Sequence, residues 1–261
     1  MRTMRARLLA LSLALLGAAG AAHGSSSAPW WSAFGDRQLD TLMRAANAAT
    51  PAAEQAVVEG YVEARLGQVR ALLATTLVRT AHRQQALLMD APAGERRNAA
   101  LAEIAHRIEA IEATAEAITG ERDEGLAELA RLSGVGLPRL QPLVAPAEGR
   151  ALLPSVDAPV PQASAMIRTD LAGRLRDLAA SARRVERAQQ LVQTRRVEMQ
   201  AHQARQQLGA EDEFGTLEAY QQFLVETDRL ALASGQLALA WAQWLHGSSV
   251  RSVATAAAGV E

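Results

Sequence analysis

The stretch LAEIAHRIEAIEATAEAI, residues 101–118, carries the pattern that decides the fold of this chain. Its apolar residues recur at steps of three and four, as Leu101, Ile104, Ile108, Ile111, Ala115 and Ile118. This spacing is typical of a helix that packs along a second helix in a left-handed coiled coil. The stretch therefore predicts a long helix, which we expect to end at Gly134, since glycine favours the position after a helix.

The residues before this stretch supply a partner helix with the same spacing. Its apolar seam is Val58, Val62, Leu66, Val69, Leu73 and Leu77. The sequence DAPAG at residues 90–94 separates the two segments, and Pro and Gly are strong breakers of helices. We therefore expect residues 57–134 to form an antiparallel helical hairpin.

The second half of the chain repeats this organisation. One predicted helix carries Leu171, Leu175, Leu178, Ala182, Val185 and Val192, and its return carries Phe223, Leu230, Leu237 and Trp244. The break is expected near residues 209–215, which gives a second hairpin at residues 166–247 and a flexible tail at residues 248–261. The predicted fold class is all-α, with two long antiparallel coiled-coil hairpins from an internal duplication. Each helix of about 35 residues would span roughly 50 Å.

The composition agrees with long helices. Hydrophobic residues make up 49% of the chain and aromatic residues only 3%, so Ala and Leu, which favour helices, dominate the apolar share. The formal net charge of −1 gives no global field that would attract nucleic acid, so none is expected as a partner. The chain has no Cys, which excludes internal disulfides and Cys-ligated metals.

The first 24 residues have the features of an export signal. Arg2, Arg5 and Arg7 precede a short apolar core, and the sequence AHG at residues 22–24 offers small residues at the cleavage positions. We therefore expect cleavage and a mature chain in the periplasm, with an uncleaved anchor as the alternative. No later stretch is long and apolar enough to predict a transmembrane helix.

Two further segments flank the hairpins. Residues 25–56 hold a short predicted helix at residues 36–49, with Asp36 as its N-cap, and Thr50-Pro51 starts the next helix. Residues 135–165 are rich in Pro, and for them we expect an extended strap without helix that joins the hairpins.

Three blocks of sequence resemble a known family. The first is WWSAFGDRQL at residues 30–39, which contains Trp30, Trp31, Phe34, Gly35 and Asp36. The second is LEAYQQFL at residues 217–224, which contains Leu217, Glu218 and Gln222. The third is ELARLSG at residues 128–134, and a connector rich in Leu and Pro follows it. In these blocks and in their order, the chain resembles the TolC/OprM-type outer-membrane efflux factors over almost all of its length after the signal.

The resemblance implies a trimeric tube that reaches through the periplasm to an adaptor protein and an inner-membrane pump. This chain departs from the family in its membrane part. A membrane-spanning strand needs about nine to eleven residues of alternating pattern, and no such run occurs where the family has its strands. We therefore expect a short form without the β-barrel, which would work with its own copies, an adaptor, a pump or a full-length outer-membrane factor.

The candidate sites are few. Glu211, Asp212 and Glu213 lie at the predicted tip of the second hairpin, where family members use acidic residues for cation preference, although a solvated turn is the simpler interpretation. His82 and His106 are expected at one height on facing helices, but zinc sites usually need three protein ligands, so no metal is predicted.

The remaining side-chain patterns predict structure rather than chemistry. The Arg-rich segment at residues 183–196 has the mixed charges of a solvated helix face, with contact to lipid or a second copy as the alternative. Trp241 and Trp244 are expected in the core. We find no phosphate-binding loop or catalytic constellation, so neither an enzyme nor a cofactor is predicted.

The leading functional hypothesis is a structural or accessory component of an envelope transport assembly. Its expected location is the periplasm, with association with the outer membrane as a further option. The alternative is a free-standing helical bundle in the periplasm that acts as a chaperone or binding module. A third reading is a chain that lost its function together with its strands.

Overall fold

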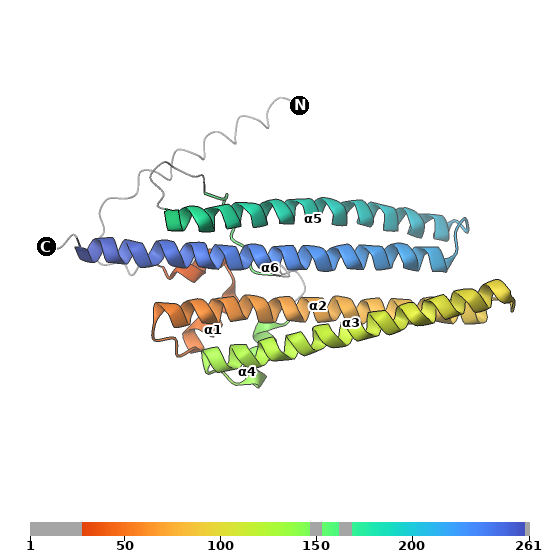
Figure 1. Cartoon of the computed structure of the whole chain (residues 1–261), viewed down its shortest axis with the longest axis horizontal. Helices are drawn as coiled ribbons and strands as arrows, with labels where there is room; N and C mark the ends of the chain where they lie inside the picture. Colours follow the sequence, from red (N-terminus) through yellow and green to blue (C-terminus); the bar gives the residue numbers. More distant parts are fainter. Residues whose placement is uncertain (1–27, 147–152, 162–168, 259–261) are drawn as a thin grey trace, which may run out of the picture.

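The structure, a computed structural model, describes residues 28–146, 153–161 and 169–258 (Figure 1). These residues form helices and no strand. The elements are η1 (Trp30–Phe34), α1 (Arg37–Ala45), α2 (Pro51–Asp90), α3 (Glu95–Ser133), α4 (Leu137–Val144), α5 (Thr169–Gln207) and α6 (Glu213–Ala258). The all-α fold with two long antiparallel hairpins, α2–α3 and α5–α6, is thus confirmed. With 39 to 46 residues each, the long helices span roughly 60–70 Å, more than predicted.

Local sequence signals set the ends of the hairpin helices. Thr50 caps α2 by accepting a hydrogen bond from the Ala53 N–H at 3.2 Å, and Pro51 occupies the first turn. Gly134 ends α3 with a φ of 70°. Gly209 ends α5 with a φ of 71°, where the Gly209 and Ala210 N–H groups bond to carbonyls of the last turn.

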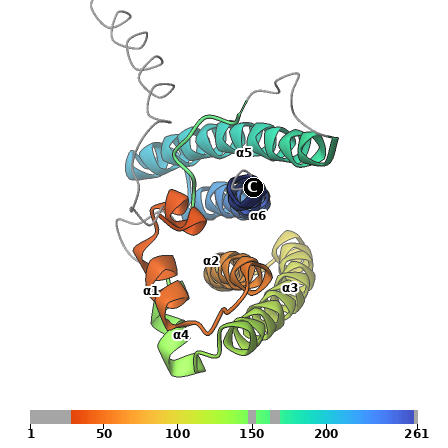
Figure 2. The same cartoon turned by 90° about the vertical axis from the view of Figure 1, so that its left-hand side faces the viewer.

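The hairpins contact each other through one helix of each. Helix α2 packs along α6, whereas α3 and α5 lie on the outside and do not pack along one another (Figure 2). Both hairpin turns lie at the same end of the molecule, which we call the tip end (Figure 1). The order across the molecule is therefore α3, α2, α6, α5.

The main core lies at the opposite end, which we call the base. There η1, α1 and α4 cover the hairpins, and the buried cluster includes Leu42, Val58, Leu129, Leu140 and Trp241. Trp244 is partly buried against the same cluster. The predicted core position is confirmed for Trp241, whereas Trp244 lies at the edge of this core.

The prediction of a connector without helix is wrong at Leu137–Val144, which forms α4. Pro138 lies in the first turn, where the missing N–H has no intrahelical acceptor, so only Pro142 removes a hydrogen bond. Leu140 and Val144 are fully buried in the main core, and their packing outweighs that loss. The described part of the strap, residues 153–161, has no regular structure, as expected.

Two other boundaries differ from the predictions. Helix α1 ends at Ala45 rather than near residue 49, and α6 continues through Gly247 to Ala258, so residues 248–258 are helical. The chain there is rich in Ala, the best helix former, and the Arg174 guanidinium donates to the Gln243 carbonyl at 2.6 Å one turn before Gly247.

The predicted export signal, residues 1–24, lies outside the described residues. Within the described ranges, no helix combines the length and the hydropathy that a bilayer crossing requires.

Candidate functional site

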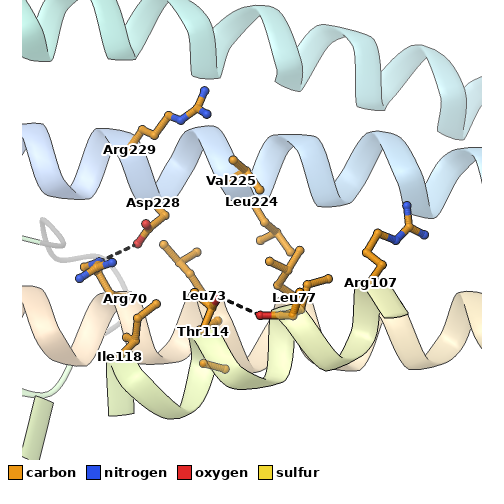
Figure 3. Close-up of a pocket in the computed structure, with 14 residues that line it drawn as sticks. Arg70, Leu73, Leu77, Arg107, Thr114, Ile118, Leu224, Val225, Asp228 and Arg229 are labelled. Carbon is orange, nitrogen blue, oxygen red and sulfur yellow. Dashed lines mark hydrogen bonds and ion pairs between the residues drawn. The ribbon is translucent and has the colours of Figure 1, made fainter. Parts of the chain in front are cut away.

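An apolar cleft lies between the two hairpins, on the side where α3 and α6 face each other across α2. It has a volume of about 360 Å³. Its wall contains Leu73 and Leu77 from α2, Ile111 from α3 and Leu224 from α6. The Leu73, Leu77 and Leu224 side chains point into the space between α2 and α6 (Figure 3). Heptad positions that would be buried in a closed four-helix bundle are thus partly open here.

Charged residues cross and border this cleft. The Arg70 guanidinium on α2 donates to Asp228 on α6 at 3.1 Å (Figure 3). It also donates to Glu121 on α3 at 3.0 Å. Arg70 thus ties both hairpins together at the base side of the cleft. Arg107 and Arg229 also line it, and Arg229 pairs with Glu226 at 2.7 Å.

Towards the tip the cleft continues into a more polar hollow of about 340 Å³. Gln221 and Glu226 line it and are more than nine-tenths buried. The Gln221 Nε2, the Glu226 Oε2 and the Arg107 Nε atoms have no hydrogen-bond partner among the described residues. Buried polar atoms are normally satisfied, so the hollow can receive groups that donate and accept hydrogen bonds.

The acidic residues at the tip of the second hairpin all bind within the chain. Glu211 accepts hydrogen bonds from His202 and from Arg205, the latter at 2.9 Å. Asp212 caps α6 by accepting from the Gly215 N–H at 3.0 Å. The carboxylate of Glu213 accepts two hydrogen bonds from Arg83 of α2, at 2.7 and 2.9 Å. The tip residues therefore fix the turn and dock it on the first hairpin.

These contacts shift the acidities of the tip carboxyl groups. The hydrogen bond from Arg83 lowers the pKa of Glu213 below its ordinary value. Burial opposes ionisation of Glu211, but the hydrogen bonds from His202 and Arg205 outweigh it and lower its pKa. Glu211 and Glu213 are thus held in the charged form that pairs with their basic partners.

Elsewhere, burial together with Glu59 and Glu128 raises the pKa of Glu63.

The Trp-Trp-Phe-Gly-Asp block forms η1 and the entry to α1. The Trp30 ring packs edge-on against those of Trp31 and His246, and Phe34 is buried in the main core. Gly35 has a φ of 59°, which favours glycine, and it turns the chain into α1. The block therefore closes the base of the bundle.

Asp36 joins this block to α2. Its carboxylate caps α1 by accepting from the Gln38 and Leu39 N–H groups, at 2.9 and 3.3 Å. It also accepts from the Tyr61 hydroxyl at 3.0 Å and lies 3.7 Å from the Arg65 guanidinium. The sequence predicted the cap but not Arg65, which is the largest of the fully buried side chains.

The other candidate residues are dispersed. Glu218 and Gln222 are exposed on α6 beside the polar hollow, and Leu217 is partly buried near them. The His82 imidazole donates to the Glu112 carboxylate at 2.8 Å, whereas His106 is exposed and lies 3.9 Å from the Glu109 carboxylate. The described parts of the chain contain no group of three His, Asp or Glu side chains arranged to hold a metal ion.

Comparisons with known proteins add no relative: no protein-family model and no curated protein matches this chain. The geometry of the helices and of the cleft is therefore what bears on function. The cleft was not predicted, because the heptad pattern alone does not say whether two hairpins close into a bundle or meet along one helix each.

Proposed function

We propose that this protein is a structural or accessory component of an envelope transport assembly, similar to the periplasmic part of an outer-membrane efflux factor. It acts by packing its long helices against other helical hairpins. The observation that supports this most is the order α3, α2, α6, α5, in which each outer helix packs along only one other long helix, although α1 and α4 cover α3 at the base.

A helical rod of this kind suits lateral contact better than catalysis. The hairpins are roughly 60 Å long, and apolar side chains remain on the surface of long helices, among them Leu72, Leu191, Val197 and Val225. The Trp-Trp-Phe-Gly-Asp block, which carries the resemblance to the efflux factors, supports the same proposal. It packs against the main core at the base, so it is part of the folded bundle. We further propose a periplasmic location and partners that include an adaptor, a pump or a full-length outer-membrane factor.

Cross-linking in the native cell tests this proposal. A tagged copy of the chain is cross-linked, purified under denaturing conditions and analysed by mass spectrometry. The proposal predicts a small, constant set of partners with the helical hairpins of a transport assembly. A cytoplasmic location, or capture of no envelope transport component, would contradict it.

The second candidate is a periplasmic chaperone or binding module. The cleft favours it, because its apolar wall and the unpartnered Gln221 and Glu226 atoms fit an amphipathic segment of a client. Substituting Leu77→Glu or Val225→Glu distinguishes the two candidates, because both residues line the cleft and neither is fully buried. A chaperone would lose a broad set of captured clients, whereas a transport component would keep its few partners on the outer helices.

A further inference from the structure

Charge is segregated between the two outer helices. Helix α3 contains nine Asp and Glu against five Arg, a formal charge of −4, whereas α5 contains four against eight, a charge of +4. Helix α2 has four of each and is neutral, and α6 has four acidic residues and two Arg. Because α3 and α5 lie at opposite edges of the molecule, one edge is acidic and the other basic (Figure 2).

The acidic part of α3 around Glu121 and the Arg-rich part of α5 also lie at the same height along the long axis of the molecule. Arg70 binds both Glu121 of α3 and Asp228 of α6, which places these two residues level with each other. Thr227, next to Asp228, lines a hollow together with Val185 of α5. The middle of α3 near Glu121 is therefore level with the Arg-rich part of α5, residues 183–187.

The outward surface of α3 at this height is smooth and acidic. Ala113, Ala117 and Gly120 are exposed, and a Cβ at Gly120 would meet no atom within 4 Å. Glu116 and Glu124 flank them, are exposed, and have no hydrogen bond or ion pair among the described residues. A surface of small residues lets another helix approach closely, and the two free carboxylates would face whatever packs there.

The outward surface of α5 is complementary to it. Arg183 and Arg187 are exposed and pair with no carboxylate in the described part of the chain. Leu191 and Val197 are large apolar side chains that are 51% and 55% exposed. Helices α3 and α5 run in opposite directions along the rod (Figure 1). At the same rise per residue, Leu191, four residues on from Arg187, is therefore level with Ala117, four residues before Glu121.

We propose that the partner of each edge is a second copy of this chain, with α3 of one copy packed antiparallel along α5 of the next. Arg183 and Arg187 would then face Glu124 and Glu116, with Leu191 set on the small residues of α3. Contact over about 50 Å of two helices buries on the order of 1,000 Å², which is enough for a specific interface. The contact is head-to-tail, so it closes into a ring or extends as a row of copies.

This inference goes beyond the proposed function, because it concerns self-association and is tested on the purified chain alone. Two charge-reversed variants are compared with the wild type by analytical ultracentrifugation, Glu116→Arg/Glu124→Arg and Arg183→Glu/Arg187→Glu. All four positions are exposed on helices, and Glu and Arg both favour helices, so folding is expected to persist and is checked by circular dichroism.

The wild type is expected to associate reversibly, and the association should weaken as salt rises from about 0.05 to 0.5 M. Each variant alone should associate about tenfold more weakly or not at all, because the two contact residues on its α3 and the two on its α5 then carry the same sign. A mixture of the two variants should associate again in a 1:1 ratio. The control Asp90→Arg/Glu95→Arg, with the same charge change at the tip of the first hairpin, should behave as the wild type does.

Three results would overturn the inference: a wild type that stays monomeric at low salt, association that survives both reversals, or a mixture that fails to restore it. None of these depends on a transport partner. Conversely, failure to capture an adaptor or pump in cells would leave the self-association result unchanged, so the two proposals fail separately.

Discussion

Replacing Arg65 by methionine is expected to destabilise the protein more than any surface change. The Arg65 side chain is 1% exposed and that of Asp36 is 6% exposed, with 3.7 Å between the guanidinium and the carboxylate. Its guanidinium also donates to the Tyr61 hydroxyl at 3.4 Å. Methionine fills a similar volume without the charge, so the substitution leaves the Asp36 carboxylate buried without its cation.

The magnitude follows from the partners that remain. Removing one member of a buried ion pair costs about 3–5 kcal/mol when the other charge is left unpaired. Asp36 keeps its hydrogen bonds from the Tyr61 hydroxyl and from two N–H groups of α1, so we expect the lower end of this range, about 3 kcal/mol. For a chain of this size, that loss lowers the Tm by roughly 6–12 °C.

Urea unfolding and thermal melting, each followed by circular dichroism, measure this loss. A double-mutant cycle with Asp36→Asn gives the control, because the variant without both charges should be less destabilised than the sum of the single variants. A loss of less than about 0.5 kcal/mol for Arg65→Met, or strict additivity in the cycle, would refute the argument that the base is fixed by this buried pair.

Three further outcomes are expected. The lowered pKa of Glu213 means that its pairing with Arg83 stabilises the fold above the ordinary value of 4.5 and is lost as the pH falls through the lowered value, so Glu213→Gln should flatten the acid side of the stability–pH profile. Leu224→Ala, at a buried position between the hairpins, should cost about 2–3 kcal/mol in urea unfolding, whereas Leu191→Ala on the exposed edge should cost less than about 0.5 kcal/mol. Gly67→Ala should lower the Tm despite the better helix propensity, since the new Cβ would lie 3.1 Å from a backbone atom of α3.

The ends of α2 and α3 could be predicted because their signals are local. Thr50 and Pro51 start α2, DAPAG at residues 90–94 ends it, and Gly134 ends α3, each through the chemistry of one or two residues. The same reasoning failed at Pro142, where the burial of Leu140 and Val144 decides for a helix. Burial of that kind comes from residues distant in sequence, which a local pattern does not contain.

The partners of the polar residues could not be predicted for the same reason. Glu213 lies at the predicted tip, but its partner Arg83 is 130 residues away in the sequence. The Arg70 contacts with Glu121 and Asp228 likewise join three helices, and they set which faces of the hairpins meet. The pattern of apolar residues fixed each hairpin, whereas these ionic contacts depend on how the hairpins are placed together.

Because the chain contains no Cys, disulfide cross-linking can test directly whether the two outer helices are the surfaces through which the protein assembles. In a variant with Ala117→Cys on α3 and Leu191→Cys on α5, mild oxidation should give a ladder of linked copies on a non-reducing gel. Each single substitution should give no more than a faint dimer. The absence of a ladder from the double variant, at concentrations where the wild type associates, would contradict the account.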